Sequence, residues 1–314
     1  MRRLVLAAIA ACSLSLAAAQ DDPAEEPAEE AAGEAAAFTG SFADVISNAT
    51  AAWVEPEGST ATPEDIEQKA LFFIGNIAWL VYHEFGHAMV SEFSIPVLGK
   101  EEDAVDSFAT INMITDESDP ALETMIVDVI DTWFTAGLYA NLSYGEHSID
   151  EQRGFAVICL LVGDDPEGYK EVADDAEMPA ERQAACKWEY EKAKNNWDSV
   201  LGANMLEEGE APTGSVGVGY GDAGEFGAAA ELLQTSGLLE TIAHQMEETF
   251  RLTGPITVSV EQCGQANAFY VPNESKVKVC YELANFFYTK AEEMTAAGDT
   301  EAPADEPEET GGPQ

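Results

Sequence analysis

The chain has 314 residues, with 14 Lys and Arg against 59 Asp and Glu, which gives a formal net charge of −45 at pH 7. So acidic a chain repels nucleic acid and anionic lipid, and this excludes a nucleic-acid-binding protein. The same field favours cationic ligands, divalent metals among them.

The N-terminal segment, residues 1–19, has the pattern of an export signal. It begins with two arginines, continues with an apolar run and ends in small residues, so we expect cleavage after Ala19. The run is short for a membrane span. Its "IAAC" box leaves a second interpretation open, a lipoprotein with a lipidated Cys12. No later stretch is apolar enough to cross a bilayer, so we expect a periplasmic or extracellular protein with no integral membrane segment once the signal is removed.

Two acidic, low-complexity segments border the rest of the chain. Residues 20–37 predict a disordered linker and residues 296–314 a disordered tail, because both are rich in Ala, Glu and Pro and poor in large apolar residues. We therefore expect one folded domain over residues 38–295.

Helical patterns predominate in the first part of this domain. Thr62 as a cap and Pro63 at the first helical position predict a long helix that ends before Pro96. Another helix is expected to start at Asp119-Pro120, and Ser148 with Glu151 predicts a capping box at the start of the next. Further helices are predicted over 41–53, 99–114 and 179–201.

The second part of the domain is mixed. Residues 209–224 are rich in glycine but lack the frame of a phosphate-binding motif, so we predict a surface loop there. A helix is expected near 226–251. Residues 255–280 then carry β-rich runs with "PNES" between them, which indicates a hairpin, and a last helix follows. The fold class predicted is α+β, mainly helical with a small sheet.

Four cysteines remain after the signal is removed. An even number in an exported chain favours disulfides, and proximity in the sequence favours the pairs Cys159–Cys186 and Cys263–Cys280. A four-cysteine metal site is the alternative, but no CxxC pair supports it.

The stretch "LVYHEFGHAMV" contains a candidate metal-binding motif. His83 and His87 are four apart, so on a helix both imidazoles can reach one zinc ion, while Glu84 lies beside them and can reach the attacking water. The apolar flanks predict a buried helix, in which polar side chains need partners that a metal would supply. Gly86 allows another backbone to approach closely. The alternative is a chance match in a helix that carries two histidines.

A carboxylate is the best candidate for a third ligand. Glu102 and Asp106 in "EDAVD" lie on one helical face, so Glu102 can bind the metal while Asp106 orients a histidine. Glu101 and Asp103 remain alternatives to Glu102, and an ordinary acidic helix start is the simpler interpretation. His244 lies far along the chain, and we interpret it as an ordinary surface or half-buried histidine.

With these pieces the chain resembles a family of bacterial zinc metallopeptidases known as a domain of unknown function. The resemblance rests on "HEFGHAMV", "PVLGKEEDAVDSFA", "EHSIDEQRGFAVICLLVGDDP", "ERQAACKWEY" and "CGQANAFYVPNESKVKVCYEL", spread over residues 75–285. It implies a zincin-like fold, Zn²⁺ and a peptide or protein substrate. In zincins a hairpin precedes the HExxH helix, whereas here the hairpin follows it, so we expect a permuted strand order with the hairpin packed beside that helix.

The resemblance also suggests an oxyanion stabiliser. Zincins with a glutamate ligand use a histidine or tyrosine from another segment, a role that His147 or Tyr144 could take; the alternative is a local capping role for His147. Asp150, Glu151 and Arg153 are expected to form a structural ion-pair set.

The function predicted is zinc-dependent peptide hydrolysis, with His83, His87 and Glu102 as ligands and Glu84 as general base. Two alternatives stay open. One is a catalytically silent zincin-like binding or scaffold protein of the periplasm, and the other is a metal-dependent hydrolase of other amides or esters.

Overall fold

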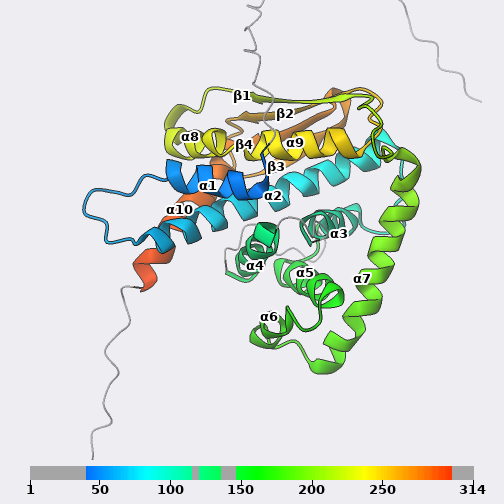
Figure 1. Cartoon of the computed structure of the whole chain (residues 1–314), viewed down its shortest axis with the longest axis horizontal. Coiled ribbons are helices and arrows are strands. Elements are labelled where there is room, and N and C mark those ends of the chain that lie inside the picture. The colour runs from blue at the N-terminus through cyan, green and yellow to red at the C-terminus, as the bar shows by residue number, and fades with distance from the viewer. Residues whose placement is uncertain (1–39, 115–119, 136–145, 299–314) are drawn as a thin grey trace, which may run out of the picture. The chain divides into compact units, whose positions relative to one another are not determined.

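The computed structural model describes residues 40–114, 120–135 and 146–298. Within these residues helices predominate and four strands form one small sheet, as expected for a mainly helical α+β fold (Figure 1). The helices are α1 (Phe42–Ala52), α2 (Pro63–Glu92), α3 (Glu101–Ile114), α4 (Pro120–Thr135), α5 (Asp150–Asp164), α6 (Lys170–Asp175), α7 (Ala180–Leu201), α8 (Gly227–Ser236), α9 (Leu238–Thr249) and α10 (Tyr281–Gly298).

Helix α2 is the central element. Thr62 accepts a hydrogen bond from the amide of Asp65 and Pro63 begins the helix, so the predicted start is confirmed. Its side chains from Lys69 to Gly86 are all buried, because α2 contacts α1, α3, α4, α9, α10 and strands β3 and β4. In Figure 1, α3, α4 and α5 lie on one side of α2, and the sheet with α8 and α9 lies on the other.

The sheet has the order β1-β2-β4-β3. Strands β1 (Ser215–Tyr220), β2 (Pro255–Glu261) and β4 (Lys276–Cys280) are parallel, and β3 (Ala268–Val271) is antiparallel to β4 at one edge. The short helical turn Pro272–Glu274 joins β3 to β4, so the hairpin predicted around "PNES" is confirmed. β3 contacts α2, which places this hairpin beside the central helix.

The glycine-rich segment was predicted as a loop, and this is wrong for residues 215–220, which form β1. Val216, Val218 and Tyr220 alternate with Ser and Gly, and the outward-facing glycines Gly217 and Gly219 have no atom near the place of a Cβ. This alternation of larger and small residues, with a period of two, is typical of a strand, but the high glycine content led to the prediction of a loop.

Two helix predictions also need correction. Residues 226–251 form two helices rather than one, because Gly237 adopts a left-handed conformation (φ 72°) between α8 and α9. The capping box of Ser148 and Glu151 is absent: Ile149 is the N-cap of α5, without a side-chain hydrogen bond, and Ser148 instead donates to Asp103.

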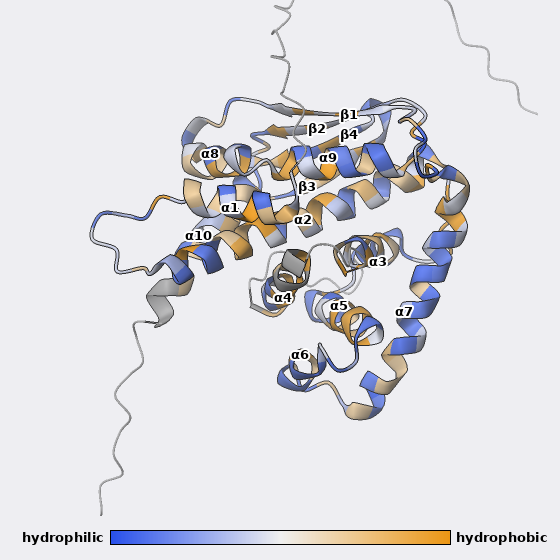
Figure 2. Ribbon diagram, viewed as in Figure 1, coloured by the Kyte–Doolittle hydropathy of each residue, from blue (hydrophilic) through white to orange (hydrophobic). Residues whose placement is uncertain are grey.

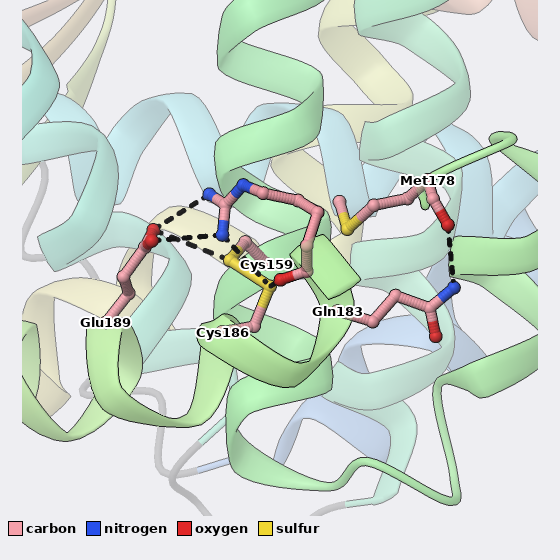
Figure 3. Close-up of a disulfide and its surroundings, with 6 residues drawn as sticks. Cys159, Met178, Gln183, Cys186 and Glu189 are labelled. Carbon is pink, nitrogen blue, oxygen red and sulfur yellow. Dashed lines mark hydrogen bonds and ion pairs between the residues drawn. A yellow bond between two sulfur atoms is a disulfide. The ribbon is translucent and has the colours of Figure 1, made fainter. Parts of the chain in front are cut away.

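Helix α7 contacts α5 along a narrow stripe. Hydrophilic residues predominate along α7 (Figure 2), and its buried side chains are Cys186, Tyr190, Trp197 and Leu201. A disulfide joins Cys159 of α5 to Cys186 of α7, beside an ion pair between Arg182 and Glu189 (Figure 3). A second disulfide joins Cys263 to Cys280 at the end of β4. Both pairs are the ones that sequence proximity favours.

Among the described residues, no helix combines the length and the apolar character that crossing a membrane requires.

Candidate metal centre

Helix α2 supplies both histidines and the glutamate of the HExxH pattern. His83 and Glu84 are buried, at 2% and 6% exposure, and His87 is partly exposed at the mouth of a pocket. The rings of His83 and His87 lie on one face of the helix, with centroids 5.0 Å apart. This is the arrangement that a spacing of four residues on a helix produces.

Glu102 comes from the first turn of α3. Its Oε2 atom lies 3.2 Å from Nε2 of His83 and 3.4 Å from Nε2 of His87. Gly86 makes this approach of the two helices possible, because a Cβ there would lie 2.7 Å from Cβ of Val105 on α3. The close packing expected at Gly86 is therefore present, and it fixes Glu102 opposite the two imidazoles.

His147 reaches the same carboxylate from the segment before α5. Its Nε2 lies 2.9 Å from Oε2 of Glu102, and its ring stacks at 6.3 Å from the ring of His83. His83, Glu102 and His147 offer three ligand atoms within 4.8 Å of one another; His87 is not part of this group and joins the centre through its approach to Glu102. His147 therefore lies in the centre itself rather than in a remote capping loop.

The far sides of both HExxH histidines are hydrogen-bonded to carboxylates. Nδ1 of His83 lies 2.8 Å from Oδ1 of Asp106, and Nδ1 of His87 lies 2.8 Å from Oε1 of Glu101. A carboxylate at Nδ1 holds the proton on that nitrogen and directs the lone pair of Nε2 toward the opposite side. In both residues that side faces Glu102.

Arg153 of α5 supports Asp106 from behind. Its Nε and one terminal nitrogen donate to the two carboxylate oxygens at 2.8 and 2.7 Å, and its guanidinium lies 3.9 Å from the ring centre of Trp133. The side chains of Arg153 and Asp106 are 1% and 8% exposed. A chain of contacts thus runs from α5 through α3 to His83 on α2.

These contacts shift the pKa values of the centre. Burial would lower the pKa of His83, but the carboxylates of Asp106 and Glu102 beside its ring outweigh burial and raise the pKa to about 9. Burial opposes ionisation of Asp106 as well, yet Arg153 and His83 lower its pKa to about 2. Burial would raise the pKa of Glu102, but the imidazoles of His147, His83 and His87 hold that pKa well below its ordinary range.

The donor set fits a zinc ion. Oε2 of Glu102 is buried and has no partner in hydrogen-bonding geometry among the described residues, although three imidazole nitrogens lie within 3.4 Å of it. Ligand atoms about 2.0–2.1 Å from one tetrahedral zinc ion are separated from each other by about 3.3 Å. The spacings between Glu102 and the histidines are close to that value, and nitrogen with carboxylate oxygen is a donor set that zinc prefers.

Glu84 faces a pocket of about 500 Å³ together with His83, His87, Glu102 and His147. Strand β3 lines the same pocket, and the backbone of its residue Tyr270 lowers the pKa of the nearby Glu84 carboxyl. Burial raises the pKa of Glu84, and the nearby histidines oppose that rise. The glutamate is therefore held inside the pocket beside the candidate ligands without occupying their common point.

The structure separates the three acidic candidates that the sequence left open. Glu102 faces the histidines, Glu101 bonds Nδ1 of His87, and Asp103 accepts from Ser148. Arg153, expected in an ion-pair set with Asp150 and Glu151, pairs with Asp106 instead. Tyr144 lies outside the described residues, and His244 is exposed on α9.

Sequence reasoning missed the contact between Glu101 and His87 and the support that Arg153 gives to Asp106. The available signal for Arg153 was a lone arginine next to the apolar run of α5, which predicts a buried charge in need of a partner.

Comparison with known proteins points the same way. The model of a family described as "Putative metallopeptidase" matches residues 44–201 and 222–310, which is most of the chain. No curated protein and no solved structure matches the chain.

Proposed function

The chain belongs to this metallopeptidase family, and we propose that it is a zinc-dependent peptidase that hydrolyses peptide bonds with Glu84 as general base. The observation that carries the proposal is the convergence of His83, His87 and Glu102 beside Glu84 in one pocket. Family membership by itself implies a metal and a peptide or protein substrate. Zinc and the roles of these residues are the proposal.

His83, His87 and Glu102 would hold the ion, and Asp106 and Glu101 would keep the two imidazoles in the required tautomer. When bound, zinc supplies a Lewis acid that polarises the scissile carbonyl and makes water acidic. Glu84 accepts the proton of the attacking water and delivers it to the nitrogen of the leaving amine.

The edge strand β3 supports a substrate in extended conformation. The carbonyl of Asn267 accepts from the amide of Cys280 on the β4 side, so in the alternation of a strand the backbone groups of Ala268 and Tyr270 point away from β4. Ala268 and Tyr270 both line the pocket. Among the described residues no strand covers this edge of β3, and a peptide that pairs there would lie beside Glu84.

The proposed layout is zincin-like with a permuted order, and it is supported by the position of β3, which follows the HExxH helix in the chain and still packs beside it. In the same proposal His147, or Tyr144, donates a hydrogen bond to the developing oxyanion. His147 has the position for it, since its Nε2 faces the pocket beside Glu102.

We also propose that the protein is exported, with residues 1–19 as signal, 20–37 and 296–314 as acidic linker and tail, and 38–295 as the catalytic domain. Two disulfides support an oxidising compartment, periplasmic or extracellular. Lipidation of Cys12 is the alternative form of export.

The test is hydrolysis of an unfolded protein such as reduced casein by the full chain loaded with zinc, with products identified by mass spectrometry. Glu84→Gln should reduce the rate by about 10²–10⁴-fold, the usual contribution of a general base, while zinc binding is kept. Glu67→Gln, an exposed glutamate on the same helix, is the matched control and should retain the wild-type rate. Full activity of Glu84→Gln would refute the mechanism, and absence of peptide products with zinc bound would favour a silent binding protein or a hydrolase of other amides or esters.

A further inference from the structure

His147 lies closer to Glu102 than either histidine of the HExxH pattern does. The separation from Oε2 is 2.9 Å for His147, against 3.2 Å for His83 and 3.4 Å for His87. The histidine named for a role at the substrate oxyanion thus has its nitrogen among the metal-ligand atoms. A donor to the oxyanion would need only to face the pocket, so the short distance to Glu102 calls for another explanation.

Two further bonds attach the His147 segment to the helix that carries Glu102. Lys100, next to the start of α3, donates from Nζ to the backbone carbonyl of His147 at 3.0 Å, and Ser148 donates from Oγ to Asp103 at 2.7 Å. Residues on both sides of Glu102 therefore hold the backbone around His147. This leaves the imidazole directed at the donor atoms of the centre.

The three histidines differ in how firmly they are fixed. His83 and His87 are on α2, with side chains 3% and 17% exposed, whereas His147 precedes α5 and its side chain is 37% exposed. Moving either HExxH histidine would disturb the central helix. His147 lies outside the helices, so a change of its side-chain rotamer would leave the central helix in place.

We propose that His147 is a fourth, displaceable protein ligand of the zinc ion, so that the resting centre has three histidines and one glutamate. This inference rests on the proposed function. Four protein donors close a zinc site, whereas a catalytic site keeps one position open. With His147 as the fourth donor the resting centre would be closed and the enzyme latent, and a turn of the His147 side chain away from the centre would open one position for water.

The test is the affinity of the full-length chain for Zn²⁺ alone, measured by competition with a chromophoric chelator. His147→Ala should raise the dissociation constant on the order of 10- to 100-fold, an effect of the size seen when support of a metal site is lost. The visible spectrum of the Co²⁺-loaded protein should change in the same variant, since the number and type of ligands change. His244→Ala removes an exposed histidine from α9 and should leave both readouts unchanged.

An unchanged zinc affinity and an unchanged Co²⁺ spectrum in His147→Ala would overturn the inference and leave His147 as an oxyanion donor at most. If the wild type binds no zinc, the proposed function itself fails, so the two failures are distinguishable. Lys100→Met provides a second variant that keeps all four donors and loosens only the His147 backbone. Lys100→Met should weaken zinc binding less than His147→Ala does. If it has no more effect than His244→Ala, that would count against His147 as a ligand held in place by Lys100.

Discussion

Arg153 donates two hydrogen bonds to the carboxylate of Asp106, and the same carboxylate lies 2.8 Å from Nδ1 of His83. The guanidinium is buried against Trp133, and Arg153 is not among the described residues that line the pocket of Glu84. Its position implies that Arg153 positions the metal ligand His83 through Asp106.

Arg153→Met should therefore weaken zinc binding on the order of 10- to 100-fold, because Asp106 loses the group that orients its carboxylate. It should also lower the stability by about 3–5 kcal/mol, the usual cost of leaving one charge of a buried pair without its partner. Arg153→Lys keeps the charge but not the two paired hydrogen bonds, so its zinc affinity and its stability should lie between those of the wild type and Arg153→Met. The measurement is zinc affinity at a temperature where circular dichroism shows a folded protein. A loss of stability with wild-type affinity would mean that Arg153 is only structural; Arg182→Met, at the partly exposed pair with Glu189, is the control.

Gly86→Ala should move α3 away from α2. The new Cβ would lie 2.7 Å from Cβ of Val105, one turn from Glu102, and overpacking of this kind costs about 1–3 kcal/mol. Zinc affinity should fall by about tenfold, an effect of the size expected when a supporting contact is disturbed. Gly99→Ala has open space around it and should behave as the wild type. Equal affinities in the two variants would show that the approach of the helices does not set the position of Glu102.

Zinc binding should strengthen as the pH rises. Without the ion the pKa of His83 is raised to about 9, so His83 is protonated at neutral pH and must lose that proton before it can bind metal. Below that pKa the proton competes with the ion, and one competing proton weakens binding by about tenfold for each pH unit. Isothermal titration calorimetry in buffers of different ionisation enthalpy measures the protons released. Release of no proton at pH 7 would contradict the raised pKa.

Removing the Cys263–Cys280 bridge should destabilise the wall of the pocket. The bridge closes a loop with a sequence separation of 17 that contains β3, and closure of such a loop contributes about 3 kcal/mol through the unfolded chain. The double variant Cys263→Ala/Cys280→Ala should therefore melt at a lower temperature, by calorimetry. Zinc affinity should change little, since β3 supplies no ligand. A large loss of zinc affinity in the folded variant would assign β3 a role in the metal centre.

The sequence predicts those features whose cause is local. Thr62 and Pro63 define the start of α2, and the spacing of His83 and His87 defines one face of that helix. The acidic run "EED" leaves three candidates for the third ligand. The choice among them depends on how α3 packs against Gly86, which is a tertiary contact.

Contacts between residues far apart in the sequence could not be predicted. Asp106 and Arg153 are 47 residues apart, and Lys100 and His147 are equally far apart, so no pattern along the chain joins them. Ser148 has the residue type of a helix cap, but it bonds Asp103 on another helix and leaves the capping position to Ile149. Strand β1 is rich in glycine, which is typical of a loop, and it is stabilised by parallel pairing with β2, a contact that the local sequence does not indicate.

The central claim is that His83, His87 and Glu102 hold one zinc ion. The most direct measurement is zinc content by elemental analysis of the full chain after reconstitution and removal of loose metal. The account predicts about one zinc per chain in the wild type and in His244→Ala, and its loss in His83→Ala and Glu102→Ala. A wild type without zinc, or both ligand variants with a full complement, would contradict it.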